Sequence, residues 1–161
     1  MTVSALIVNA TKADFDQIIT ELEDFWGDHS TARLHHVSLI NQFGNSAFVV
    51  KEGERVVAYL FGFLSQVEPS SWVHLVAVRK SHQGRGWGRQ LYQRFIEFAR
   101  EHGAKEVMAQ TSLDNLGSVR FHKSIGMELL GEPDERGIPV VKDRSGPGRD
   151  RIVFRMSIEG V

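Results

Sequence analysis

Apolar residues follow a helical period near the start of the chain and a strand period in several later segments. Between Phe15 and Trp26 they recur every three or four positions, which predicts a helix capped by Thr11 or Asp14. The other predicted elements are strands at 3–8, 46–50, 56–63, 72–78, 106–111 and 152–158, and helices at 31–43, 88–102 and 115–125. Strands that lead into helices in the second half indicate an α/β fold.

A Pro/Gly-rich segment, residues 131–148, interrupts this pattern and is expected to be a surface loop within one domain spanning 1–161. A chain of 161 residues is long enough to bury one ordinary core. With 42% hydrophobic and 24% charged residues, the composition is that of a folded, soluble protein.

Composition also excludes several classes of protein. The longest apolar run, residues 56–64, is far shorter than the ~20 residues that span a bilayer, so we expect no membrane insertion. Residues 1–10 lack the basic segment of a secretion signal, which makes a cytoplasmic location the expectation. The absence of cysteine excludes disulfides, thiolate zinc sites and a cysteine nucleophile. A net charge of −1 argues against nucleic acid as a partner, and a homodimer is left open.

The net charge conceals two oppositely charged halves. Residues 1–78 carry four Lys/Arg against nine Asp/Glu, whereas residues 79–161 carry fifteen against eleven. The excess begins in the segment 79–94, which contains five basic residues and no acid. This run indicates either a local anion site or a solvated helix face.

Glycines at 84, 86 and 88 favour the anion site. They lie between a predicted strand and a predicted helix, where they let the backbone approach a ligand and turn successive N–H groups toward one anion. The N-terminus of the following helix adds partial positive charge. The basic side chains expected around the site are Arg79, Lys80, Arg85 and Arg89. These features predict a site for a pyrophosphate-like group.

Two common phosphate-binding motifs do not fit this loop. A P-loop requires a Gly-Lys pair, and the chain has none. The dinucleotide motif G-x-G-x-x-G fails because position 89 is Arg, and the loop does not follow the first strand.

A third pattern matches. Gln83-Gly-Arg-Gly-Trp-Gly88 follows the apolar triplet Val76, Ala77, Val78 and resembles motif A of the GNAT-type N-acetyltransferases, [QR]-x-x-G-x-[GA]. Residues 115–127 are similar to a second block of that family, N-x-x-[AS]-x-x-[FL]-Y-x-x-x-G-F. The resemblance implies a GNAT fold: a mixed, mostly antiparallel sheet of about six to seven strands, splayed near the cofactor site, with helices on both faces.

The resemblance also implies acetyl-CoA as cosubstrate, with no metal. The backbone of Val76, Ala77 and Val78 would pair with the pantetheine amides, and Asn115 would bond the pantetheine arm. Ser118 would also contact the cofactor. The pyrophosphate would lie against Gln83, Gly84, Arg85, Gly86, Trp87, Gly88 and Arg89. Trp87 would either cover the cofactor or pack beside it.

Two histidines are the candidate catalytic residues. An amine attacks a thioester only when neutral, so a base is required, and the imidazole of His74 suits that role near neutral pH. Some family members carry a His at the matching strand position. The alternative is a histidine packed beneath the hairpin that the strands at 46–50 and 56–63 are predicted to form across residues 52–54. His122 stands where most members have Tyr as general acid, so it would either protonate the leaving thiolate or position CoA.

The acceptor is less closely defined by the sequence. We expect a primary amine of a small molecule, with Glu21, Asp24, Trp26 and Asp28 lining its pocket or forming a solvated face. His29, His35 and His36 suggest surface histidines rather than a metal site. The alternatives are a protein N-terminal or lysine acetyltransferase, and a non-catalytic acyl-CoA sensor.

Overall fold

The computed structural model describes residues 5–160, which divide into two compact units. Unit 1 consists of the described residues up to Phe63 together with His74–Phe98, and unit 2 of Leu64–Val73 and the described residues from Ala99 onward. Strand β4 (Ser70–Val78) belongs to both units, its first four residues to unit 2 and the rest to unit 1. Seven of the strands in the described residues form one mixed sheet of order β1-β2-β3-β4-β5-β9-β6, and β7 and β8 pair separately.

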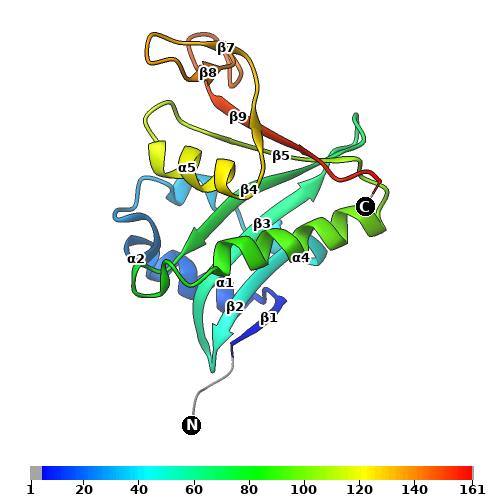
Figure 1. Ribbon diagram of the computed structural model, residues 1–161. Helices are drawn as coiled ribbons and strands as arrows, with labels where there is room; N and C mark the ends of the chain where they lie inside the picture. The colour runs from blue at the N-terminus through cyan, green and yellow to red at the C-terminus, as the bar shows by residue number, and fades with distance from the viewer. Residues whose placement is uncertain (1–4, 161) are drawn as a thin grey trace. The chain divides into compact units, whose positions relative to one another are not determined.

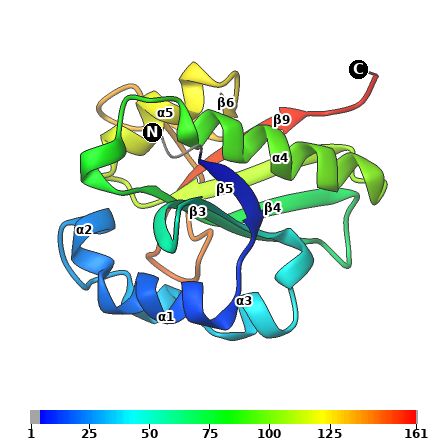
Figure 2. The same cartoon turned by 90° about the horizontal axis from the view of Figure 1, so that it is seen from below.

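Unit 1 is built on an antiparallel ladder. Strand β1 (Leu6–Asn9) pairs with β2 (Ala47–Glu52), and β2 pairs with β3 (Arg55–Leu64) across a tight turn. The hairpin predicted around residues 52–54 is therefore confirmed. Helices α1 (Lys12–Thr20) and α3 (Ser38–Asn41) cover one side of these strands, and α4 (Trp87–Glu101) lies on the other (Figure 2).

The core of unit 1 follows from the alternation of the strands. Ala47 and Val49 of β2 face helices α1 and α2 (Leu22–Trp26), while Phe48, between them, meets Phe98 of α4 edge to face at 6.4 Å. The buried residues on the α1–α3 side are Ala10, Phe15, Ile18, Leu22, Phe25, Leu39, Ala47, Val49, Val56, Tyr59, Phe61, Leu75 and Ala77.

The predicted first helix is two helices. Thr11 and Asp14 both contribute to the start of α1, as a capping box in which each side chain accepts a hydrogen bond from the other's backbone N–H. Glu21 leaves helical geometry (φ −108°, ψ 26°), so the chain stops and restarts as α2. The predicted helix at 31–43 is also wrong as one element, since it forms the short 3₁₀ turn η1 (Ala32–Leu34) and α3.

Unit 2 contains the remaining strands (Figure 1). Strand β4 pairs in parallel with β5 (Glu106–Thr111) through Ser70–Glu106 to Val73–Ala109, and β5 pairs with the antiparallel strand β9 (Ile152–Ser157). Strand β6 (Glu128–Leu129) completes this part. Helix α5 (Leu116–Ser124) begins after Asn115, as predicted.

The segment 131–148 is not loop throughout. It contains the hairpin of β7 (Glu132–Pro133) and β8 (Pro139–Val140). Gly131, beside this hairpin, has φ +96°, and a Cβ there would lie 2.0 Å from the carbonyl oxygen of Val140. Only glycine fits that close approach.

Within residues 5–160, none of the helices has the length and apolarity required to cross a bilayer.

Candidate functional site

The glycine loop of unit 1 has the backbone that the sequence predicted. Gly84 and Gly86 adopt φ +78° and +83°, and Gly88 lies in the first turn of α4. A Cβ built at either of the first two glycines would meet no atom within 4 Å, so the loop faces open space. The side-chain amide of Gln83 donates to the carbonyl of Val78 at 3.3 Å and ties the loop back to β4. The N-terminus of α4, a helix of fifteen residues, thus lies next to an exposed loop whose glycines have positive φ.

The expectation that Arg79 contributes to the anion site is wrong. Its side chain is 1% exposed and turns to the helices, where it donates to Asp24 at 2.8 Å and Glu21 at 3.3 Å. It also donates twice to the carbonyl of Val56, at 2.6 and 3.0 Å, and its guanidinium lies 4.6 Å from the ring centroid of Phe25. Arg79 therefore binds the α1–α2 junction to the hairpin, and much of the acidic charge expected at the acceptor pocket is neutralised.

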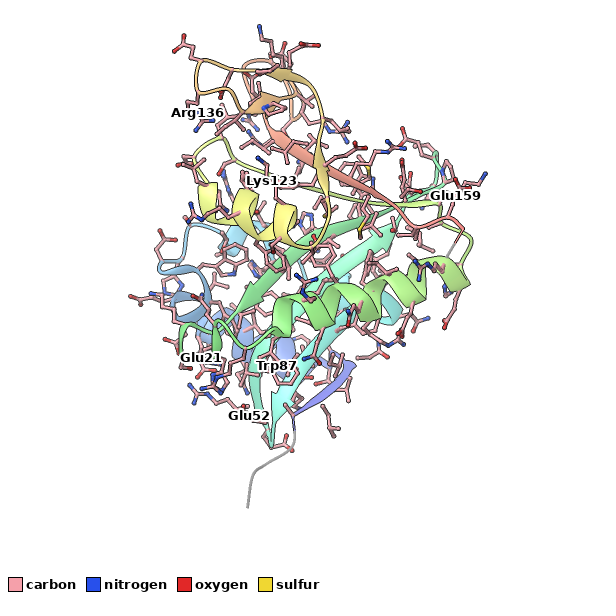
Figure 3. The ribbon with its side chains drawn as sticks, in the orientation of Figure 1. Glu21, Glu52, Trp87, Lys123, Arg136 and Glu159 are labelled. Carbon is pink, nitrogen blue, oxygen red and sulfur yellow. The ribbon has the colours of Figure 1, made fainter. Side chains whose placement is uncertain are left out.

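Exposed basic side chains remain around the loop. Lys80, Arg85 and Arg89 are all exposed, and Arg85 bonds only weakly to the carbonyl of Ser81, at 3.4 Å. Trp87 lies at the start of α4 (Figure 3), half-buried, and its indole Nε1 is buried with no hydrogen-bond partner among residues 5–160. A buried N–H without a protein acceptor fits a ligand atom beside the loop.

His74 lies on the less buried face of β4. Its neighbours Val73 and Leu75 are buried, whereas His74 is exposed. Its Nε2 lies 3.1 Å from the carbonyl oxygen of Leu34, and its ring lies 6.4 Å from that of Phe63. A carbonyl only accepts, so Nε2 carries the proton in this arrangement and the Nδ1 lone pair is available.

Sequence reasoning missed two buried polar residues near His74. Tyr59 is 0% exposed, and His35, assigned above to surface histidines, is 8% exposed and bonded to the Tyr59 hydroxyl at 2.7 Å. Trp26, expected at the acceptor pocket, donates to the same hydroxyl at 2.6 Å. The signal in the sequence was a Tyr inside a buried strand, because a buried hydroxyl requires a partner.

In unit 2 the structure joins three predicted site residues in one hydrogen-bond network. The Asn115 side chain accepts from the Ser118 N–H at 3.2 Å, as the N-cap of α5, and donates to the Thr111 hydroxyl at 3.0 Å. The Ser118 carbonyl accepts from Nδ1 of His122 at 2.8 Å. Asn115 therefore fixes the first turn of α5 through Ser118 and ties it to the end of β5 through Thr111.

His122 is buried and neutral. It is 4% exposed and stacks on Phe154 with ring centroids 4.2 Å apart. Burial lowers the pKa of His122 to about 4, although its hydrogen bond to the Ser118 carbonyl opposes that shift. At neutral pH His122 therefore carries no charge, and its proton is on Nδ1.

Among the described residues, no cluster of three or more His, Asp or Glu side chains is arranged to hold a metal ion. His35, one of the three histidines considered for such a site, uses both ring nitrogens in hydrogen bonds to Thr31 and Tyr59.

Comparison of the sequence with models of known protein families identifies its family. Residues 14–127 match the model of the acetyltransferase (GNAT) family, and the chain belongs to it. The predicted fold class is confirmed by solved structures. A GNAT-family protein from Desulfovibrio desulfuricans superposes with a TM-score of 0.77 at 18% identity, covering 96% of this chain and 99% of that one. YncA from Salmonella typhimurium, solved with its cofactor acetyl-CoA, superposes with a TM-score of 0.64 at 21% identity, over 98% and 95%.

Curated relatives are similar over part of their length. An L-methionine sulfoximine/L-methionine sulfone acetyltransferase of Salmonella typhimurium is 35% identical over 77 residues, 48% of this chain and 42% of the relative. The L-amino acid N-acyltransferase MnaT of Escherichia coli is 34% identical over 76 residues, 47% and 41%. The chain thus spans less than half the length of these two relatives.

Proposed function

We propose that this protein is an acetyl-CoA-dependent N-acetyltransferase that transfers an acetyl group to the primary amine of a small, amino-acid-like molecule. The observation that carries the proposal is the open, left-handed backbone at Gly84 and Gly86 ahead of α4. Exposed Lys80, Arg85 and Arg89 beside it suit a pyrophosphate, and the unpartnered indole N–H of Trp87 suits an acceptor atom of the cofactor.

The acceptor class rests on two considerations. The named activities of the relatives are on L-methionine sulfoximine, L-methionine sulfone and L-amino acids. Pairing of Glu21 and Asp24 with Arg79 weakens the argument for a polycationic acceptor. A small amine that also carries a carboxylate fits better than a lysine-rich protein tail.

In the proposed reaction His74 acts as base, through water or directly. The neutral amine attacks the thioester carbonyl carbon, a C–N bond forms, and the C–S bond breaks. Nδ1 of His74 accepts the amine proton. CoA leaves as a thiolate, which then takes up a proton. The amine attacks the thioester directly in a ternary complex, so no cysteine is required.

The role of His122 follows from its protonation. A residue with pKa about 4 rarely holds a second proton at neutral pH, and its Nδ1 proton is committed to the Ser118 carbonyl. We therefore propose that His122 positions α5 and the cofactor contact of Ser118. Protonation of the thiolate by His122 remains the alternative role.

The decisive experiment is thiol release from acetyl-CoA over a panel of L-amino acids, methionine analogues, polyamines and N-terminal peptides. We expect turnover with the amino-acid-like amines, and a His74→Ala variant that keeps its CoA affinity while losing turnover. Calorimetry should detect CoA binding in the low micromolar range or tighter and no NAD binding. Failure to bind millimolar CoA would refute the assignment, and CoA binding without turnover on any amine would favour an acyl-CoA sensor.

A further inference from the structure

A chain of three hydrogen bonds, one buried and two partly buried, runs through unit 1. Trp26 donates from Nε1 to the hydroxyl of Tyr59 at 2.6 Å, and that hydroxyl lies 2.7 Å from Nε2 of His35. Nδ1 of His35 lies 2.8 Å from the carbonyl oxygen of Thr31. His35 is also in ring contact with both Trp26 and Tyr59, at 6.2 and 5.8 Å.

The partners fix the direction of every bond in this chain. An indole N–H only donates and a carbonyl only accepts, so Nδ1 of His35 must carry a proton toward Thr31. Nε2 of His35 is then the acceptor for the Tyr59 proton. Burial lowers the pKa of His35 and raises that of Tyr59, so both side chains stay neutral and the arrangement holds at neutral pH.

This network holds the short turn η1 at both ends. The Thr31 carbonyl accepts from the N–H of Leu34 at 2.9 Å as well as from the His35 ring, and the His35 N–H donates to Ala32 at 3.0 Å. Residues 31 and 35 flank the turn, and one buried side chain, His35, connects them both to Tyr59. The position of the Leu34 carbonyl is therefore set by the core rather than by solvent.

That carbonyl is the hydrogen-bond partner of His74, at 3.1 Å from Nε2. We propose that the Trp26–Tyr59–His35 network is a positioning device: by fixing the Leu34 carbonyl, it holds His74 as the Nε2–H tautomer and presents Nδ1 as the proton acceptor. The inference rests on the proposed function, in which His74 is the base. Tyr59 and His35 act through His74 and are positioning residues.

Tautomer state can be measured without any acetyl transfer. Long-range ¹⁵N–¹H spectra of the ¹⁵N-histidine-labelled protein, recorded at alkaline pH, distinguish a protonated ring nitrogen from an unprotonated one. The His74→Gln spectrum assigns the resonances. We expect His74 to show a protonated Nε2 and an unprotonated Nδ1.

Two variants test the device. Tyr59→Phe keeps the ring in the core and removes the hydroxyl. His35→Gln replaces the rigid ring by a flexible amide, which no longer fixes the Thr31 carbonyl and the Tyr59 hydroxyl together. Each should move the two His74 resonances toward one another and lower kcat by roughly three- to tenfold, with KM for acetyl-CoA unchanged. His36→Ala, an exposed neighbour on the same segment, is the matched control and should change neither readout.

The outcomes separate this inference from the proposed function. A wild-type His74 protonated on Nδ1, or variants that leave both tautomer and kcat unchanged, would overturn the positioning device. If Tyr59→Phe fails to fold, His35→Gln decides. A fixed tautomer with unchanged turnover in His74→Ala would instead overturn His74 as base, and with it the catalytic purpose of the device.

Discussion

The guanidinium of Arg79 lies 2.8 Å from a carboxylate oxygen of Asp24, a residue 55 positions earlier in the chain. Arg79 directly follows β4 and precedes the glycine loop by a few residues, yet its charge is directed away from that loop into the α1–α2 junction. The sequence position of Arg79 suggests an anion site, but its contacts show a structural role.

Replacing Arg79 should therefore cost stability rather than cofactor binding. Arg79→Met keeps an apolar stem but leaves the Val56 carbonyl buried without its two donors and removes both ion pairs. We expect the free energy of unfolding to fall by about 3 kcal/mol in urea denaturation. CoA affinity, measured where the variant is folded, should be unchanged. Arg33→Met, at an exposed arginine of the same unit, is the control, and an unaltered stability with lost CoA affinity would contradict the assignment.

Gly86 offers the most direct test of the anion cradle. Gly86→Asp places a carboxylate in open space at φ +83°, beside the expected pyrophosphate. Like-charge repulsion should weaken CoA binding by at least ~100-fold in calorimetry. Gly53→Asp, at φ +59° in the β2–β3 turn and equally open, carries the same strain without the cradle. Both variants should lose about 1 kcal/mol of stability, and equal CoA affinities would rule out the site.

His122 should make the protein less stable in acid. Its pKa is near 6.5 in the unfolded chain and about 4 in the fold, so between these values the unfolded state binds a proton that the folded state does not. Stability is fully present above pH 6.5 and falls as the pH drops toward 4, by up to about 3 kcal/mol.

The test compares how steeply the free energy of unfolding changes with pH in different variants, because carboxylates also titrate in this pH range. His122→Asn keeps a donor for the Ser118 carbonyl and has no titrating ring. The dependence of unfolding free energy on pH between 4 and 6.5 should be shallower in this variant, whereas exposed His36→Ala should match the wild type. Parallel curves for all three proteins would show that His122 is not held neutral by burial.

Gly131 should be intolerant of any side chain. A Cβ there would lie 2.0 Å from the Val140 carbonyl oxygen, at φ +96°. We expect Gly131→Ala to cost about 3 kcal/mol and to open the segment 131–148 to proteolysis. Gly137→Ala, at φ +79° with nothing within 4 Å, should cost only about 1 kcal/mol, from backbone strain. Similar losses of stability in both variants would mean that the chain can move the Val140 carbonyl away from a Cβ at position 131 at little cost.

Most of the fold was predictable because its signals are local. The capping residues Thr11 and Asp14, the alternation of β2 and β3, and the start of α5 after Asn115 each depend on a few neighbouring residues. The break at Glu21 and the collapse of the predicted helix at 31–43 into η1 and α3 were missed, because apolar periodicity does not show where polar side chains bond across the fold.

For the site, the sequence by itself determined the local features of the loop, namely the positive φ at Gly84 and Gly86 and the helix that follows them. Only the tertiary structure decided where buried polar groups find partners. Arg79 bonds to Asp24, and His35 bonds to Tyr59, across separations of 55 and 24 residues. A conformational preference is a property of one residue, whereas the partner of a buried polar group is chosen by the packing of the whole core.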